Sequence, residues 1–192
     1  YSVFCDSDGS VWAGTKGNGL WRLRPEGGRF RFRHYVHSDS DPYSLSNDNV
    51  YCVAQDTAGR IWVATFGGGV NILSGDGKFL NPYNSISSYP LQEGARARYI
   101  LCDGTDKVFV ATTEGLMLCD PSERPEDMSF HLYRHSPSDH TSIGGNDVTY
   151  LMKDSASRVW ACTYGGGLGL ICSYAPDGTP EFRNYTVVDG LL

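Results

Sequence analysis

The sequence predicts an all-β fold built from four similar units, and three observations lead to that prediction. One pattern recurs four times, in full in the first two units and in weaker form in the last two: an Asp-x-x-Gly turn, a short run of β-branched and aromatic residues that ends in threonine, and a turn that contains glycine. Thr15, Thr65, Thr112 and Thr163 stand 50, 47 and 51 residues apart, and such a period marks repeat units that bury their faces on one another. The 23 glycines and 12% aromatic residues also suit many tight turns between packed strands.

Each unit is expected to contain four strands, most clearly the second unit. Residues 51–56 have the pattern of a buried strand, and the turn after them uses Asp56 to cap the backbone and Gly59 to supply a positive φ. Strands follow at 60–65 and 70–73, and a fourth begins at Lys78. No segment shows the apolar spacing of a helix. Four strands in about 40 to 50 residues make the blade of a β-propeller.

The chain is expected to be a single propeller segment with blades at 1–50, 51–97, 98–148 and 149–192. Each predicted blade begins at its first strand, so the four blades are divided at the same position of the repeat. Propellers close with roughly four to eight blades, and a ring of four usually needs a strand shared between the termini or a covalent clasp. The sequence shows neither device. We therefore expect a partial arc of a larger propeller, with a closed ring of four as the alternative.

Composition excludes two classes of partner. A net charge of −6 argues against a nucleic-acid backbone, which needs a surplus of Lys and Arg on some face. No run of 18 apolar residues occurs, so no direct membrane insertion by this segment is expected. The chain opens without a charged and apolar leader and without Met, which predicts an excerpt or a mature segment of something longer.

The repeated pattern Asp-x-x-Gly-x-Ile/Val-Trp-x-x-Thr-x-x-Gly-Gly-Leu/Val, with residues 44–50 before the second unit, resembles the two-component regulator propeller repeat. The resemblance covers all four units and is strongest in the second. It is weakest in the third, where Phe109 replaces Trp, and Ser157 replaces the turn glycine of the fourth. The resemblance implies the periplasmic sensor region of a bacterial hybrid two-component histidine kinase, in a family that often senses polysaccharide breakdown products.

The function implied is signal sensing, without catalysis by this segment itself. The expected partners are an oligosaccharide ligand, the remaining blades of the parent propeller, and a second copy of the parent in a homodimer. Two alternatives stay open: a propeller enzyme of the lyase or glycan-cleaving type, and a scaffold for protein interactions. A His and a carboxylate that converge on the propeller axis would favour the enzyme, and a large exposed apolar patch would favour the scaffold.

A ligand is expected on the face that collects the turns between second and third strands and the connections between blades. Sugar-binding sites usually combine an aromatic ring, which packs against the sugar, with polar groups that form hydrogen bonds to its hydroxyls. Phe66 and Tyr164 are favoured because each precedes three glycines, although rings in such loops are equally often structural. The full set of candidate ligand residues is Phe66, Tyr164, Asn18, Glu114, Tyr43, Tyr89, Arg96, Asp139 and His140.

Other residues that could suggest a binding or reactive site are expected to have structural roles. The series Trp12, Trp62, Phe109 and Trp160 is predicted to be core, because stacked blades need a large flat residue in each second strand. The cysteines are expected to be small buried fillers in preference to disulfides, and they form no C-x-x-C pair. The triple glycines lack the Lys-Ser/Thr and the helix of a phosphate site.

No metal site and no cofactor are predicted. The aspartates of 6–9 and of 39–41 are fragments of a calcium loop without its distal glutamate, so turn capping is the better account. His37 and His135 stand at equivalent positions in different blades, which suggests one structural job repeated at the rim.

Overall fold

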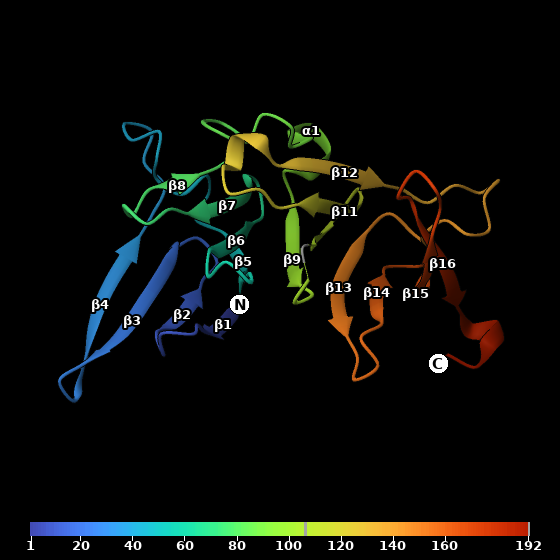
Figure 1. The fold of residues 1–192 in the computed structure, drawn as a ribbon, viewed down its shortest axis with the longest axis horizontal. Helices are drawn as coiled ribbons and strands as arrows, with labels where there is room; N and C mark the ends of the chain where they lie inside the picture. The colour runs from blue at the N-terminus through green and yellow to red at the C-terminus, as the bar shows by residue number, and fades with distance from the viewer. Residues whose placement is uncertain (106, 192) are drawn as a thin grey trace.

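The computed structural model describes residues 1–105 and 107–191, which form four antiparallel four-stranded sheets (Figure 1). Blade 1 contains β1 (Ser2–Cys5), β2 (Val11–Gly14), β3 (Leu20–Glu26) and β4 (Arg29–Tyr35). Blade 2 contains β5 (Val50–Gln55), β6 (Ile61–Thr65), β7 (Gly69–Leu73) and β8 (Phe79–Leu80). Blade 3 contains β9 (Ala97–Cys102), β10 (Val108–Thr112), β11 (Gly115–Asp120) and β12 (Ser129–Tyr133). Blade 4 contains β13 (Val148–Lys153), β14 (Val159–Thr163), β15 (Gly167–Tyr174) and β16 (Pro180–Tyr185).

The four sheets form an open arc. Each sheet is a meander in chain order, and the first strands of successive blades lie next to one another, β5 between β1 and β9, and β9 between β5 and β13. Figure 1 shows blade 1 and blade 4 at opposite ends of this arc. The prediction of an all-β propeller arc is therefore confirmed.

The strands fall close to the expected blade limits. β5, β9 and β13 begin one residue before the predicted starts at 51, 98 and 149. Helical structure in the described residues is short: α1 (Leu91–Gly94), with single turns of 3-10 helix at Pro125–Asp127 and Val187–Asp189. Across that same part of the chain, none of the helices has the length and apolar character needed to cross a membrane.

Each contact between blades is sealed by its own apolar cluster. Blades 1 and 2 share one around Trp12 and Val63, and blades 2 and 3 share one around Trp62 and Val110. Blades 3 and 4 share a third around Phe109. In blades 1 to 3, the aromatic residue of the second strand therefore packs against the following blade.

The tryptophan of the repeat is tied to the aspartate of the preceding turn. The Asp6 carboxylate accepts hydrogen bonds from the backbone N–H groups of Asp8 (3.0 Å) and Ser10 (2.8 Å) and from the Trp12 indole Nε1 (2.8 Å). Asp56 and Asp154 repeat the arrangement, each accepting from its own tryptophan at 2.8 Å. A buried indole N–H needs a partner, so the turn that reverses the chain also makes burial of the tryptophan possible.

Burial of the aromatic series depends on the position of the blade. Trp12, Trp62 and Phe109 are completely buried, whereas Trp160 of blade 4 is half-buried, because no described blade follows it. Blade 1 shows the mirror image on its opposite face. Val3 and Phe32 are 79% and 60% exposed, whereas Val53 and Phe79 at the equivalent register of blade 2 are 4% and 2% exposed. Both ends of the arc therefore present apolar sheet faces.

This difference in burial predicts unequal costs for the same substitution. Trp62→Ala should lower the free energy of unfolding by roughly 3–5 kcal/mol, because it removes a fully buried indole and leaves a cavity. Trp160→Ala should lower it by markedly less, although the same bond to aspartate is lost. Urea unfolding followed by circular dichroism measures both. Equal losses would show that the hydrogen bond to aspartate, and not burial between blades, dominates the contribution of the tryptophan.

The first turn of blade 4 carries local strain. Its fourth residue, Ser157, has φ 63°, a value that the matching Gly9 (77°) and Gly59 (82°) adopt without penalty. No other non-glycine residue in 1–105 and 107–191 has a positive φ. A β-carbon added at Gly59 would meet nothing closer than Gln55 Nε2 at 3.8 Å, so space does not require glycine at this position. The positive φ of the backbone is the reason why glycine is favoured at this position.

Ser157→Gly should therefore stabilise the protein. Relief of the left-handed conformation is worth about 1–2 kcal/mol, and the greater freedom of glycine in the unfolded chain offsets about half of it. We expect the free energy of unfolding, measured by thermal unfolding, to rise by about 0.5–1 kcal/mol. The matched control is Gly59→Ser, which should destabilise by a similar amount. A loss of stability in Ser157→Gly would mean that the serine side chain has a structural role of its own.

Candidate functional site

The inner strands of all four blades line one cavity of about 500 Å³ on the concave side of the arc. We call its lining the axial wall, because it faces the region around which the blades are arranged. Its residues come from β1, β5, β9 and β13 and from the positions just before them: Tyr1, Ser2, Val3, Phe4, Tyr51, Cys52, Val53, Arg98, Tyr99, Thr149 and Tyr150.

A row of stacked rings begins on the axial wall at Tyr1 and Tyr51 and continues to Phe66, which lies outside the cavity lining. The rings of Tyr1 and Tyr51 lie 4.8 Å apart at 12° to each other, and the Tyr51 ring lies 5.0 Å from that of Phe66 at 23°. Two guanidinium groups continue the row, with Arg98 5.5 Å and Arg96 5.9 Å from the centre of the Phe66 ring. Cations placed near an aromatic face are attracted by its negative charge density.

An ion pair extends this row toward blade 4. Arg98 Nη2 donates to Asp147 Oδ2 at 3.2 Å, and Arg98 Nε lies 3.1 Å from Asp147 Oδ1 without hydrogen-bond geometry, so an ion pair with one hydrogen bond joins the two groups. Both side chains keep about a third of their surface in solvent. The Asp147 backbone oxygen accepts from the N–H of Tyr164 at 2.8 Å, which fixes the carboxylate to the turn of blade 4.

Tyr99 and Tyr150 form a second aromatic pair on the axial wall. Their rings lie 4.3 Å apart, and the Tyr99 hydroxyl donates to the Tyr150 hydroxyl at 3.3 Å. Burial, followed by this hydrogen bond, raises the pKa of Tyr99 above its ordinary value. Tyr150 is 49% exposed, so its ring remains available. The axial wall thus combines exposed rings with hydroxyl and guanidinium groups, and the Asp147 carboxylate lies beside it against Arg98; rings and such polar groups together recognise polyols.

The repeat register explains how the axial wall is assembled. Tyr1, Tyr51, Arg98 and Thr149 each stand five residues before the turn aspartate of their blade, and Tyr99 and Tyr150 come one position later. Sequence reasoning missed these residues because it searched the connecting loops. The sequence pattern that could have identified them is a large planar side chain that recurs at the start of the first strand, as Tyr1, Tyr51 and Arg98.

Two of the predicted ligand residues are brought together here. Phe66 and Arg96 pair as an isolated antiparallel bridge, and the Phe66 ring is half-buried beneath the guanidinium. Tyr164 lies apart from them, with 81% of its surface exposed. Asp139 and His140 border a different hollow of about 340 Å³ beside the Gly165 turn.

The remaining predicted residues are dispersed or buried. Asn18 and Glu114 lie exposed on the turns of blades 1 and 3, and the Tyr43 ring lies 5.2 Å from Lys78 Nζ near the outer edge of blade 2. Tyr89 requires a correction. It is 5% exposed, its hydroxyl donates to the Gly94 oxygen at 2.7 Å, and its ring packs in the cluster between blades 2 and 3. Its connecting segment folds inward, so Tyr89 supports the core and presents no ring to a ligand.

The glycine turns hold neighbouring blades together. The N–H groups of Gly17 and Gly19 both donate to the Asp48 oxygen, and those of Gly67 and Gly69 both donate to the Ala95 oxygen, at 2.8–3.1 Å. These donors are occupied, so the turns at residues 17–19 and 67–69 do not offer them to a phosphate.

His37 and His135 perform the same structural job, as their equivalence predicted. The Nδ1 atoms contact the backbone oxygens of Leu45 (2.7 Å) and Ile143 (2.8 Å), which closes each connecting loop. His37 also contacts Asp39 Oδ1 through Nε2 at 3.0 Å. Within the described ranges, no three His, Cys, Asp or Glu side chains are grouped so that they could hold a metal ion.

The cysteines differ from the expectation in part. All six are free. Cys52 and Cys119 are buried fillers as predicted, but Cys5 and Cys172 are exposed. Cys5 lies on a face of blade 1 that no described blade covers, which is why a position expected to be internal is open to solvent.

The surroundings of His37 predict a pH dependence. The Leu45 oxygen, followed by Asp39, raises the pKa of His37 above 6.5. Protonated His37 therefore stabilises the fold below the pKa of the unfolded chain, and this contribution is lost as pH rises through the folded pKa. NMR titration should show the raised pKa, and Asp39→Asn should lower it. A His37 pKa unaffected by Asp39→Asn would show that the carboxylate contact does not persist in solution.

Comparison with known proteins supports the sequence resemblance. The family model for the two-component regulator propeller matches residues 44–67, so this stretch is a repeat of that family, as the sequence indicated. No curated protein matches the chain by sequence.

Solved structures extend the similarity to the whole arc. The extracellular domain of a protein described as a hybrid two-component system of B. thetaiotaomicron is 25% identical and matches all of this chain, with a TM-score of 0.70. The extracellular domain of a protein described as a one-component system of the same organism is 24% identical over 96% of this chain, with a TM-score of 0.72. The chain spans about a quarter of each, 23% and 24%. Virginiamycin B lyase of Staphylococcus aureus shares the fold at 17% identity over 96% of this chain and 54% of its own, with a TM-score of 0.59.

Proposed function

We propose that this chain, a stretch of two-component regulator propeller, senses an extracytoplasmic signal by binding a glycan-derived ligand on its axial wall. The observation that carries the proposal is the continuous row from Tyr1 through Tyr51 and Phe66 to the guanidinium of Arg98. The exposed rings of Tyr1 and Tyr150 supply faces for the apolar side of a sugar, and Arg98, Asp147 and the tyrosine hydroxyls supply donors and acceptors for its hydroxyl groups.

The comparisons support the sensory part of this proposal. The two-component structure that matches the whole chain is an extracellular domain. We infer a periplasmic location, in a parent protein whose histidine kinase activity resides in other domains. The uncovered faces of blades 1 and 4 would pack against the remaining blades of that parent, which we propose to act as a homodimer.

A ligand on the axial wall could transmit a signal through blade packing. The row of rings and ions takes residues from blades 1, 2 and 3 and from the connection before blade 4, so one ligand can contact all of them. Preferential binding to one spacing of the blades would shift the population toward that spacing. The parent protein would pass this change toward its membrane helix.

The enzyme alternative has less support. A lyase or glycan-cleaving propeller needs an acid or base at the axis, and the residues that line the axial wall include no histidine. The contact between His37 and Asp39 lies in the outer connection between blades 1 and 2. The scaffold alternative would use the exposed apolar face of blade 1, where Val3 and Phe32 lie.

Calorimetric titration with short neutral and acidic oligosaccharides tests the proposed function. We expect at least one to bind, and Tyr150→Ala to weaken binding about tenfold, equivalent to about 1.4 kcal/mol. Tyr83→Ala is the matched control, because this ring is 62% exposed but lies away from the axial wall. Tyr164→Ala separates the two locations for a ligand. If Tyr150→Ala binds normally and Tyr164→Ala does not, recognition occurs at the glycine turns and the axial wall is not the site.

A further inference from the structure

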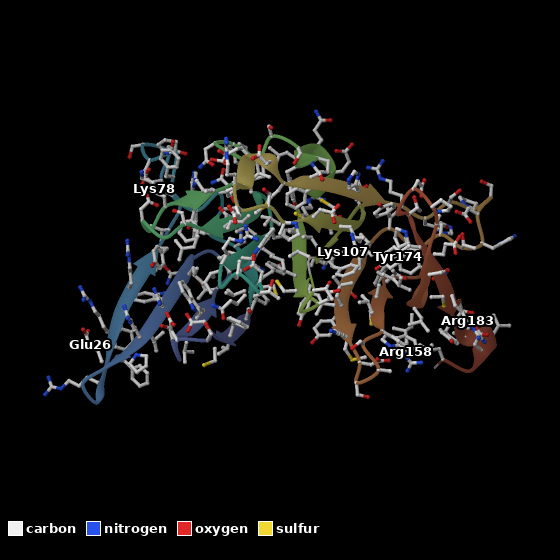
Figure 2. All side chains as sticks on the ribbon, viewed as in Figure 1. Glu26, Lys78, Lys107, Arg158, Tyr174 and Arg183 are labelled. Carbon is white, nitrogen blue, oxygen red and sulfur yellow. The ribbon has the colours of Figure 1, made fainter. Side chains whose placement is uncertain are left out.

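The outer hairpin of blade 1 differs from its counterpart in blade 2. β3 and β4 each have seven residues, whereas β7 has five and β8 has two. The hairpin therefore extends beyond the neighbouring blade, and Figure 1 shows it projecting from the end of the arc. Figure 2 shows Glu26 near its far end.

The register places five arginines and one glutamate on one face of this hairpin: Arg22, Arg24, Glu26, Arg29, Arg31 and Arg33. Arg22 pairs with Arg33 and Arg24 pairs with Arg31, and residues opposite each other in a sheet point to the same side. The other face is apolar and aromatic. It carries Trp21, Leu23, Pro25, Phe30 and Phe32.

We call the four arginines that line the hollow on this face, Arg22, Arg24, Arg31 and Arg33, the arginine ladder. Like charges directly opposite each other destabilise a pair of strands, so this arrangement is unfavourable without an anion. Arg22 Nη2 lies 3.8 Å from Asp6, and the guanidinium groups of Arg22 and Arg33 lie over the rings of Trp12 and Tyr35 at 4.9 and 4.8 Å.

The outer pair lacks such compensation. Among the described residues, Arg24 and Arg31 take part in no ion pair, and both are exposed. The acidic group nearest in register is Glu26, which pairs with Arg29 at the tip. The turn of blade 2 reaches only as far as Arg33, whose Nη2 would be 3.2 Å from a β-carbon at Gly77. A hollow of about 230 Å³ remains, lined only by Arg22, Arg24, Arg31 and Arg33.

We propose that the arginine ladder is a binding site for a multivalent oxyanion that carries two or more sulfate or phosphate groups. Arginines two positions apart on a strand are separated by about 7 Å, and arginines on adjacent strands by about 5 Å. Each guanidinium can donate two parallel hydrogen bonds to a tetrahedral oxyanion. The site lies on the outer strands and shares no residue with the axial wall, so it does not depend on the proposed function.

Two probes separate the sources of such an anion: sucrose octasulfate carries sulfate esters on a sugar, and tripolyphosphate carries phosphates alone. Calorimetry at low and physiological salt should show binding of at least one probe to the protein. Arg24→Gln/Arg31→Gln should weaken it at least tenfold. Arg124→Gln/Arg134→Gln, which removes the same charge from exposed arginines of blade 3, should leave it within twofold.

A second measurement guards against an unfolded variant. In the absence of anions, Arg24→Gln/Arg31→Gln should melt at the same temperature as the parent or higher, because repulsion between opposed charges is relieved. Added probe should raise the melting temperature of the parent more than that of this variant. Absence of binding by both probes, or equal weakening in the blade 3 control, would overturn the proposal. Retention of full affinity in Arg24→Lys/Arg31→Lys would overturn the assignment of paired guanidinium contacts.

Discussion

The hydrogen bond from the tryptophan indole to the aspartate of the preceding turn is the interaction on which the blade depends. One carboxylate holds the turn closed through two backbone amides and also satisfies the only polar atom of the tryptophan. The ring can then be buried against the next blade without an unpaired donor. Where Phe109 replaces the tryptophan, no donor needs a partner, and Asp103 accepts from Thr105 instead. The aspartate that closes the turn of one blade therefore also allows the tryptophan of that blade to be buried against the next blade.

Once the blades stack in this way, the position of the proposed ligand site follows from the register of the repeat. The strands that supply the interfaces also set the positions five residues before each turn aspartate, and these positions meet on the concave side. Tyr1, Tyr51 and Arg98 occupy three of them. A repeat thus builds a composite wall from single residues of several blades, none of which forms a site within its own blade.

The sequence predicted the blades well because their determinants are local: a turn aspartate, a glycine and an alternating strand lie within about ten residues of one another. The axial wall could not be predicted in the same way. The contacts between Tyr1 and Tyr51 and between Tyr99 and Tyr150 join residues about 50 positions apart, and they depend on the curvature between blades. Phe66 and Arg96 lie next to each other, and their part in ligand binding stays a prediction. Tyr89 was misplaced because a polar connecting segment folded its ring into the core.

The cluster between blades 2 and 3 contains three thiols, and their environment has a chemical consequence. Burial raises the pKa of Cys52 to about 11 and that of Cys102 to about 12, and it raises the pKa of Cys119 further. Only the thiolate attacks a disulfide or an alkylating reagent, so a raised pKa makes these thiols less reactive at neutral pH. These cysteines are thus kinetically protected from oxidation while the interface stays closed. The rate at which these cysteines are alkylated therefore reports how often blades 2 and 3 separate.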